Sequence, residues 1–429
     1  MTSRGRLDLA SIEHQVAKVL SVPTVRLVAA PSGGSRAAFS VETPTNEHAA
    51  FLRLDDGESG MSGTAFDLRR EAAILEHVRR AGLQVPAVLG SIDEPQGTVL
   101  EYIEGTSRLG PGVADTVGAE YMGWIAATHR VDASDAPVEH FPTIDAAVRS
   151  DVAWWNERAV GGRLDAEPLV ALAMRVLGET QPVVPEAPVF VHGDVGPGNF
   201  MVRNDRIAAV LDWELAHLGD PHEDLAWLWM RGAHSDFGDP WRRFAEYEVA
   251  AGAAIDERRL RWHLAFVIYK TVVALRLRLR QAGGTRLVMT QFVLLIVYEA
   301  LLAWSLAHLL GTPVELLDDE PVDAATPESR VVERLAEAMT SDDREALAAL
   351  EHLRLAAGQR EWRNASLFAD CRSELGCEPS RLAASVRSAT RAQLAGMARV
   401  LGRDASRACW SLPPALRRVR RAQAIGLGT

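Results

Sequence analysis

Lysine is almost absent from this sequence of 429 residues. Only Lys18 and Lys270 occur, so nearly all of the positive charge is arginine. We therefore expect any anion to be bound by arginine side chains and backbone amides rather than by a lysine ammonium. The formal net charge of −11 disfavours a protein that neutralises nucleic-acid phosphates through a general positive field. No nucleic-acid partner is therefore predicted.

Cysteine is also scarce, and long apolar runs are missing. The three cysteines, Cys371, Cys377 and Cys409, lack the paired CxxC spacing of a metal site, so reduced thiols are expected. No secretory signal is visible in the first thirty residues, which favours a cytoplasmic location. The longest apolar zone, 287–310, has charge-free stretches shorter than the roughly 18 residues of a spanning helix. A buried helix is predicted there, and no membrane association.

The remaining composition is that of a globular protein, with 48% hydrophobic and 24% charged residues. Residues 1–105 mix short strand-like runs with one charged helix. Residues 106–310 follow a helical period, except for 187–213, where proline, glycine and β-branched residues replace it. The acidic, proline-containing segment 311–327 predicts a linker, and 328–429 predicts a helical accessory domain.

The segment that interrupts the helical period carries the strongest motif. It contains Asp194 and Asn199, and Asp212 follows after two short strand-like runs at 200–203 and 207–211. A turn-prone Asn-Asp pair separates these runs, so they are predicted to form a hairpin. The hairpin would return Asp212 to the neighbourhood of Asn199, and three oxygen-bearing side chains would then converge.

Such a convergence suits phosphoryl transfer. Magnesium prefers hard oxygen ligands near the β and γ phosphates, and the acceptor hydroxyl needs a carboxylate close to it. Protein kinases place an Asp, four residues and an Asn in the catalytic loop, and a second metal-binding Asp comes later. Asp194, Asn199 and Asp212 follow the same order and spacing.

The motif His-Gly-Asp, four residues, Asn resembles that of the aminoglycoside-phosphotransferase family, and the resemblance covers roughly residues 10–310. The run 212–226 resembles the branch related to acyl-CoA-dehydrogenase-linked phosphotransferases. The family implies a protein-kinase-like α+β bilobal fold, with a small antiparallel sheet lobe and a helical lobe, here followed by the helical C-terminal domain. It also implies ATP and Mg²⁺ as cofactors. By this resemblance Asp194 is the catalytic carboxylate, and Asn199 and Asp212 hold magnesium.

The same resemblance assigns the nucleotide clamp to the N-terminal lobe. Gly33, Gly34 and Ser35 resemble the shortened phosphate loop of the family, although such residues also form ordinary hairpin turns. Arg53 stands where many members carry a phosphate-binding lysine, and an arginine fork can hold phosphate too. Glu71 is its expected ion-pair partner, with a solvated residue on a helix face as the alternative.

Two further sets of residues have expected roles. Glu101, Tyr102 and Ile103 resemble the linker between lobes that contacts adenine through backbone groups. Asp224 is expected to cap the apolar helix that begins at Leu225, and so to stabilise the structure rather than react.

The residues contain no recognisable code for the acceptor, which is expected to be a small molecule with a hydroxyl group. The branch resemblance makes a hydroxyacyl-CoA or hydroxy acid the leading hypothesis, with an acyl-CoA dehydrogenase-type protein as a functional partner. An aminoglycoside, another antibiotic or another small alcohol is the alternative enzyme substrate. A non-catalytic nucleotide-binding interaction module is the alternative of another class, which the complete set of Asp194, Asn199 and Asp212 disfavours.

Overall fold

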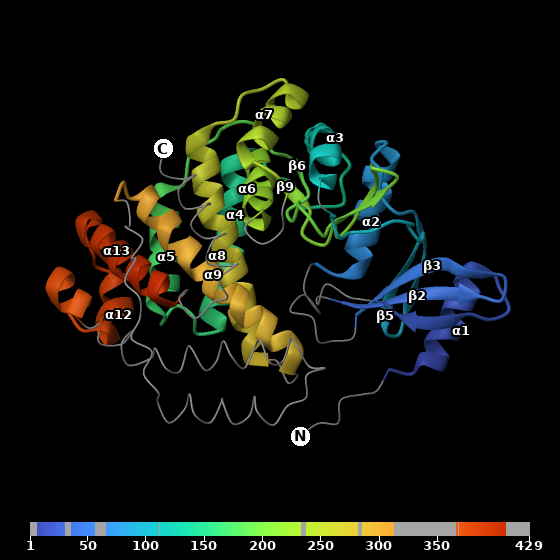
Figure 1. Cartoon of the computed structure of the whole chain (residues 1–429), viewed down its shortest axis with the longest axis horizontal. Coiled ribbons are helices and arrows are strands. Elements are labelled where there is room, and N and C mark those ends of the chain that lie inside the picture. Colours follow the sequence, from blue (N-terminus) through green and yellow to red (C-terminus); the bar gives the residue numbers. More distant parts are fainter. Residues whose placement is uncertain are drawn as a thin grey trace. The chain divides into compact units, whose positions relative to one another are not determined.

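The computed structural model describes residues 7–30, 36–55, 66–110, 112–232, 237–281, 285–312, 366–367 and 369–408. The chain divides into two compact units, each built from two separate parts of the sequence (Figure 1). They comprise Met1–Val148 with Val184–Asp256, and Arg149–Val183 with Glu257–Thr429. The domain boundaries predicted at residues 105, 310 and 327 lie elsewhere in the sequence and stay predictions.

The first unit contains a five-stranded antiparallel sheet with the strand order β1-β2-β3-β5-β4. The strands are β1 (Arg26–Ala29), β2 (Ala37–Thr43), β3 (Asn46–Leu54), β4 (Val88–Asp93) and β5 (Gln96–Leu100). Side chains alternate between the two faces of a strand, so Leu52 and Leu54 on β3 point to one face and Arg53 to the other. This alternation separates the apolar core of the sheet from its polar face.

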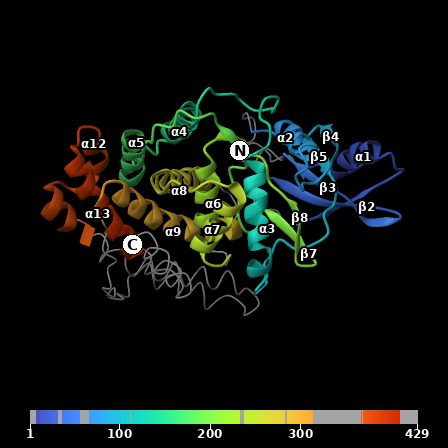
Figure 2. The same cartoon turned by 90° about the horizontal axis from the view of Figure 1, so that it is seen from above.

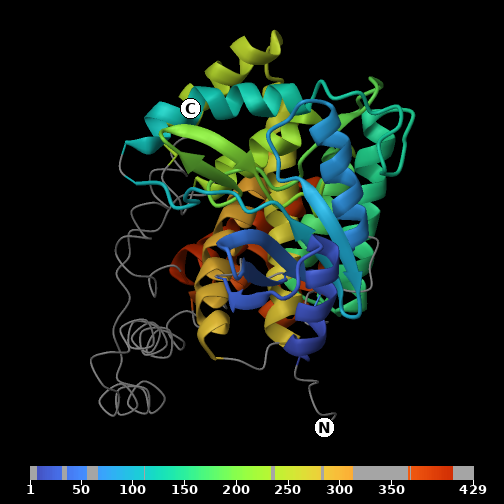
Figure 3. The same cartoon turned by 90° about the vertical axis from the view of Figure 1, so that its right-hand side faces the viewer.

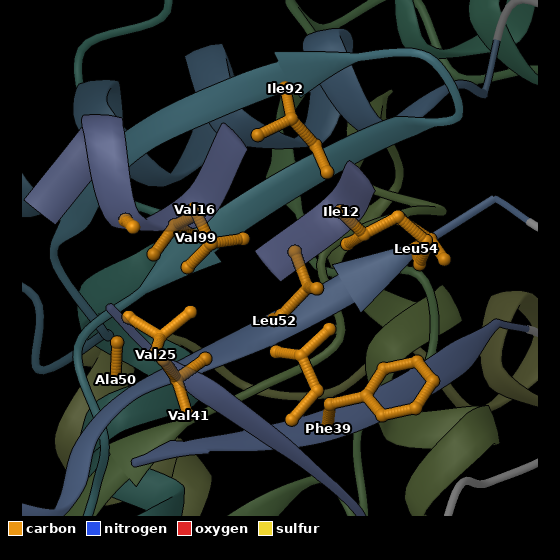
Figure 4. Packing of buried hydrophobic residues seen from close by; sticks show 12 residues of the cluster. Ile12, Val16, Val25, Phe39, Val41, Ala50, Leu52, Leu54, Ile92 and Val99 are labelled. Carbon is orange, nitrogen blue, oxygen red and sulfur yellow. The ribbon is translucent and has the colours of Figure 1, made fainter. Parts of the chain in front are cut away.

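Helix α1 (Leu9–Leu20) covers the apolar face of the sheet. Ile12 and Val16 of the helix are fully buried and pack with Leu52 and other aliphatic side chains of the strands (Figure 4). Asp8 caps the helix, because its carboxylate accepts a hydrogen bond from the Ser11 amide at 3.2 Å. The apolar layer leaves the opposite face of β3 available for charged residues.

Helix α2 (Leu68–Arg80) follows the sheet strands and matches the helix predicted from the apolar spacing at 66–81. Asp67 caps it by accepting a hydrogen bond from the Arg70 amide at 2.8 Å. Gly82, expected to end the helix, has φ +92°, a conformation that favours glycine. The buried side of α2 includes Leu75 and, less usually, the carboxylate of Glu71.

Short strands and helices complete the first unit. The strands are β6 (Val189–Val191), β7 (Phe200–Arg203), β8 (Arg206–Val210) and β9 (His217–Gly219), and the helices are α3 (Val113–Thr128), α6 (Pro221–Arg231) and α7 (Pro240–Ala251). β6 pairs with β9, and β7 pairs with β8, as the predicted hairpin requires. Asn204 and Asp205 form its turn with φ of +52° and +56°.

The second unit is helical in its described parts. Its helices include α5 (Pro168–Thr180), α8 (Glu257–Gln281), α9 (Thr285–Leu309), α12 (Leu382–Val386) and α13 (Arg391–Ala408), with α4 (Ile144–Gly161) leading into it. A π-helical turn (Cys371–Leu375) and a 3₁₀ turn (Pro379–Arg381) precede α12. α8 and α9 lie side by side (Figure 3), and α12 and α13 pack against α5 (Figure 2).

These elements bear on the remaining sequence predictions. The antiparallel sheet and the helices confirm the α+β class, and the described part of the C-terminal segment is helical. The apolar zone at 287–310 is a helix whose side chains from Leu295 onward are mostly buried. No helix in the described part of the chain is long and apolar enough to cross a membrane. Cys371 and Cys377 are free thiols, and Cys409 lies outside the described residues.

Candidate active site

The loop between β6 and β7 carries the His-Gly-Asp motif, and a buried carboxylate holds it in place. The amides of His192 and Gly193 donate to the two oxygens of Asp224 at 3.0 and 2.9 Å. Gly193 has φ +78°, and a Cβ at this position would lie 2.6 Å from the carbonyl oxygen of Leu215. Glycine is therefore required for both its conformation and its close packing.

The expected helix-capping role of Asp224 is wrong. α6 begins at Pro221, and its cap is Asp220, which accepts a hydrogen bond from the His222 amide at 2.9 Å. Asp224 lies one turn further on, is fully buried, and also bonds His129 Nε2 at 3.0 Å. Burial alone would raise the pKa of Asp224, but the hydrogen bond and charge of His129 hold it below its usual range. The residue anchors the loop, as its expected structural role requires.

The three oxygen-bearing side chains of the motif do come together. Asn199 Nδ2 donates to the backbone oxygen of Asp194 at 2.7 Å and to its carboxylate at 2.8 Å. The amide of Leu211 donates to the backbone oxygen of Asn199 at 2.8 Å, so the next residue, Asp212, is held beside it. Because the amide nitrogen of Asn199 faces Asp194, its side-chain oxygen is the atom left for a metal ion.

Asp212 itself is held in an unusual conformation. Its φ of +65° is uncommon for a residue with a side chain and is retained only where the surroundings impose it. The following residue, Trp213, is fully buried, and His192 Nε2 bonds the carbonyl oxygen of the preceding residue, Leu211, at 2.9 Å. The local backbone is thus tied to the motif loop on one side and to the core on the other.

Arg53 joins the sheet to this centre. Its Nη1 donates to Glu71 Oε1 and its Nη2 donates to Asp212 Oδ1 at 3.0 Å. Glu71 is 3% exposed, so the ion-pair reading holds and the solvated reading is wrong. Burial alone would raise the pKa of Asp212, but the charge and hydrogen bond of Arg53 hold it below its usual range. Asp212 is therefore ionised near neutral pH.

Two charged residues that the sequence did not single out with confidence complete the network. Arg36 is 4% exposed, its Nη1 lies 2.8 Å from Asp55 Oδ2, and its Nε lies 3.7 Å from Glu214 Oε2. Glu214 Oε2 also lies 3.7 Å from Arg53 Nη2. Burial, together with the charge of Asp212, raises the pKa of Glu214 to about 8. Arg36 directly follows the glycine-rich segment, and this position was its only signal in the sequence.

A second arginine, Arg231 at the end of α6, contacts the motif Asp directly. Its Nε donates to Asp194 Oδ1 at 3.0 Å, and its Nη2 donates to Asp194 Oδ2. Burial raises the pKa of Asp194 above its usual value in spite of this guanidinium. The pattern of the sequence held no signal for this pair, because its members lie in different elements.

The polar face of the sheet borders a cavity of about 650 Å³. Its apolar walls include Ala38, Leu100 and Met201, a surface suited to a planar base. His48 and Tyr102 stack at its lining with ring centroids 4.3 Å apart. The predicted nucleotide and metal residues that line it are Arg53, Glu71, Glu101, Ile103, Asn199 and Asp212. Gly33, Gly34 and Ser35 lie outside the described residues.

The chemistry of the donors suits a magnesium nucleotide. The Asn199 side-chain oxygen and the Asp212 carboxylate are hard oxygen ligands of the kind that Mg²⁺ prefers. Arg36 and Arg53 gather positive charge at the same end of the cavity, where phosphate groups would need it. The cavity therefore joins an apolar wall to a polar end with both metal-binding and phosphate-binding groups.

Comparison with known proteins places this geometry in a family. Acyl-CoA dehydrogenase family member 10 of Mus musculus is 25% identical over 199 residues, which cover 41% of this chain and 18% of that protein. Viomycin phosphotransferase of Streptomyces vinaceus is 28% identical over 151 residues, covering 31% and 50%. The chain thus spans half or less of the length of the curated relatives it matches.

A solved structure from Ralstonia eutropha JMP134, assigned to the aminoglycoside phosphotransferases, matches with a TM-score of 0.54 at 17% identity, covering 71% of this chain and 98% of that one. This likeness confirms the predicted protein-kinase-like fold of these enzymes. A family model described as the phosphotransferase enzyme family, APH, matches residues 26–263, more than half of the chain. With a match of this extent over the sheet, the motif loop and α6, the chain belongs to the phosphotransferase enzyme family.

Proposed function

We propose that this protein is an ATP- and Mg²⁺-dependent kinase that transfers the γ-phosphoryl group of ATP to a hydroxyl group of a small molecule. The observation that carries the proposal is the convergence of Asp194, Asn199 and Asp212 beside a cavity whose polar end also holds Arg53. A protein that only bound nucleotide would have no chemical need for a carboxylate facing the acceptor.

Each residue has a distinct part in the proposed reaction. Asp194 orients the acceptor hydroxyl and takes its proton as the oxygen attacks the γ-phosphorus. The new O–P bond forms while the bond to the bridging β–γ oxygen breaks, and ADP leaves with that electron pair. Arg53 holds phosphate oxygens, and Glu71 keeps its guanidinium aimed at them.

Asn199 and Asp212 would hold magnesium through the Asn199 side-chain oxygen and the Asp212 carboxylate. The bound ion neutralises charge on the β and γ phosphates. The backbone groups of Glu101 and Ile103, which line the cavity, would contact adenine. The glycine-rich segment, with Gly33, Gly34 and Ser35, remains the proposed phosphate loop.

The acceptor is proposed at the level of chemical class. The likeness to a protein of the acyl-CoA dehydrogenase family supports a hydroxyacyl-CoA or hydroxy acid. The likeness to viomycin phosphotransferase supports an aminoglycoside or other antibiotic. An acyl-CoA dehydrogenase-type functional partner stays a prediction.

The test is magnesium-dependent ADP release in the presence of hydroxyacyl-CoA esters, free hydroxy acids and aminoglycosides, with product masses to confirm phosphate transfer. Asp194→Asn should abolish transfer while ATP still binds. Asp205→Asn is the matched control, because Asp205 lies exposed in the β7–β8 turn and Asn tolerates its φ of +56°. Transfer by the Asp194 variant at the wild-type rate would refute the assigned chemistry.

A further inference from the structure

The carboxylate that the proposed function assigns to the acceptor hydroxyl is already engaged on both of its oxygens. Asp194 Oδ1 accepts a hydrogen bond from Arg231 Nε at 3.0 Å. Asp194 Oδ2 accepts from Arg231 Nη2 and from Asn199 Nδ2, the latter at 2.8 Å. The guanidinium therefore holds the carboxylate as a two-pronged fork, the strongest geometry for this kind of pair.

Arg231 is built into the motif loop rather than resting on a surface. It is the last residue of α6, where the helix dipole favours a positive charge. Its Nη1 donates to the backbone oxygen of Pro197 at 3.2 Å. Gly196, with φ +135°, makes room for it, because a Cβ there would lie 2.6 Å from Arg231 Cδ. The Arg231 and Asp194 side chains are only 20% and 15% exposed.

This pairing has a consequence for the acceptor. An acceptor hydroxyl must come within hydrogen-bond distance of an Asp194 oxygen, roughly 2.6–3.2 Å. To make room, Arg231 must give up at least part of its bond to Asp194. A largely buried guanidinium that loses its carboxylate without replacement is costly, so an acceptor that supplies a new anion is favoured over one that does not.

We infer that Arg231 selects acceptors that carry an anionic group, a carboxylate or a phosphate, within a few bonds of the hydroxyl. The incoming anion takes over part of the arginine fork and leaves an Asp194 oxygen for the hydroxyl. This inference rests on the proposed function and narrows its acceptor class.

Both acceptor hypotheses are affected. A polycationic aminoglycoside would bring like charge against Arg231, although the net charge of −11 on the whole chain would attract it from a distance. A hydroxyacyl-CoA presents a neutral thioester near its hydroxyl, and its phosphates lie far away along the molecule. A free hydroxy acid or a phosphorylated alcohol therefore suits Arg231 better than either.

The chemical step is the same for these acceptors. The acceptor hydroxyl oxygen forms a bond to the γ-phosphorus of ATP, the bond to the bridging oxygen breaks, and ADP leaves. The hydroxyl proton passes to Asp194. The anionic group that pairs with Arg231 is unchanged in the product, a phosphate ester with one more acidic group than the substrate.

The test compares acceptors that share a hydroxyl and differ in charge. We would measure kcat and KM for 3-hydroxybutyrate, its neutral methyl ester, 3-hydroxybutyryl-CoA, glycerol 3-phosphate and the cationic 1-amino-2-propanol. The wild type should prefer 3-hydroxybutyrate over the ester by about 10- to 100-fold in kcat/KM, the usual size of a charge-assisted hydrogen bond. The glycerol 3-phosphate arm distinguishes a phosphate from a carboxylate as the preferred anion.

Variants of Arg231 separate recognition from support of the loop. Arg231→Gln should remove most of the preference through a higher KM for the acid, and Arg231→Lys should restore part of it by charge without the fork. Arg206→Gln is the control, because Arg206 pairs with Glu120 at 2.9 Å on an exposed edge. An equal loss on acid and ester in Arg231→Gln would show that Arg231 only positions the loop, and a wild type without preference for the anion would overturn the inference.

A binding measurement keeps this outcome distinct from failure of the proposed function. If no acceptor is phosphorylated, calorimetric titration of 3-hydroxybutyrate and its methyl ester into the protein with ADP and Mg²⁺ still applies. Tighter binding of the acid that disappears in Arg231→Gln would support the anion site while the kinase proposal fails. Equal binding, or none, would overturn the anion site as well.

Discussion

Asp224→Asn is the substitution that most directly tests how the catalytic loop is held. The carboxylate is fully buried and accepts three hydrogen bonds at 2.9–3.0 Å, from the amides of His192 and Gly193 and from His129 Nε2. Asparagine has the same shape, but it has no charge and turns one oxygen into a donor group. At least one N–H that now bonds a carboxylate oxygen would then face another donor.

The expected cost follows from these contacts. Losing one hydrogen bond to a charged acceptor costs about 1.5–3 kcal/mol, and leaving its buried donor unsatisfied adds about 1–3 kcal/mol. We therefore expect Asp224→Asn to lower the free energy of unfolding by about 3–5 kcal/mol, measured by urea denaturation. Displacement of the loop by even about 1 Å should reduce kcat by about 100-fold in the ADP-release assay.

Asp67→Asn provides the matched control for this substitution. Asp67 caps α2 with one hydrogen bond to the Arg70 amide, and asparagine caps a helix about as well as aspartate. Its effect should stay within about 0.5 kcal/mol. If Asp224→Asn were as mild as this control, in stability and in kcat, the account of Asp224 as the anchor of the loop would be refuted.

Two further substitutions test the charged network around the cavity. Arg53→Ala should weaken ATP binding by about 10- to 100-fold in calorimetric titration, whereas Ala at exposed Arg69 should not, and equal affinities would contradict the phosphate clamp. Glu214 has a folded pKa of about 8 against an ordinary value of 4.5, so the folded state keeps a proton that the unfolded state loses. Its contribution to stability is therefore lost as the pH rises from about 4.5 to about 8, and Glu214→Gln should remove that part of the decline in urea denaturation curves. Parallel curves for the variant and the wild type over this range would count against a protonated Glu214.

The hairpin and the spacing of the motif were predictable from the sequence because their causes are local. The turn-prone Asn204-Asp205 pair and the two short strands determine how the chain returns from Asn199 to Asp212. The charged helix was equally predictable, because its apolar residues recur with helical spacing. For the same reason the motif pointed to phosphoryl transfer before any coordinates were considered.

The errors and omissions share one physical cause, which is that a charge pattern does not reveal burial. A carboxylate on a helix can face solvent, as one reading of Glu71 held, or be buried against an arginine of a distant strand. Asp224 near the start of a helix resembles a cap in the sequence, but in the structure it faces the motif loop. Only the packing of the surrounding elements decides between such alternatives.

The sequence alone therefore determined the family, the order of the motif and the elements that carry it, because these depend on local spacing and turn chemistry. The tertiary structure decided which charges meet. Arg53 reaches Asp212 across 159 positions of sequence, and Arg231 reaches Asp194 across 37. Such pairs form because burying a charge is costly unless an opposite charge is brought to it, and which charges are brought together is set by the fold as a whole.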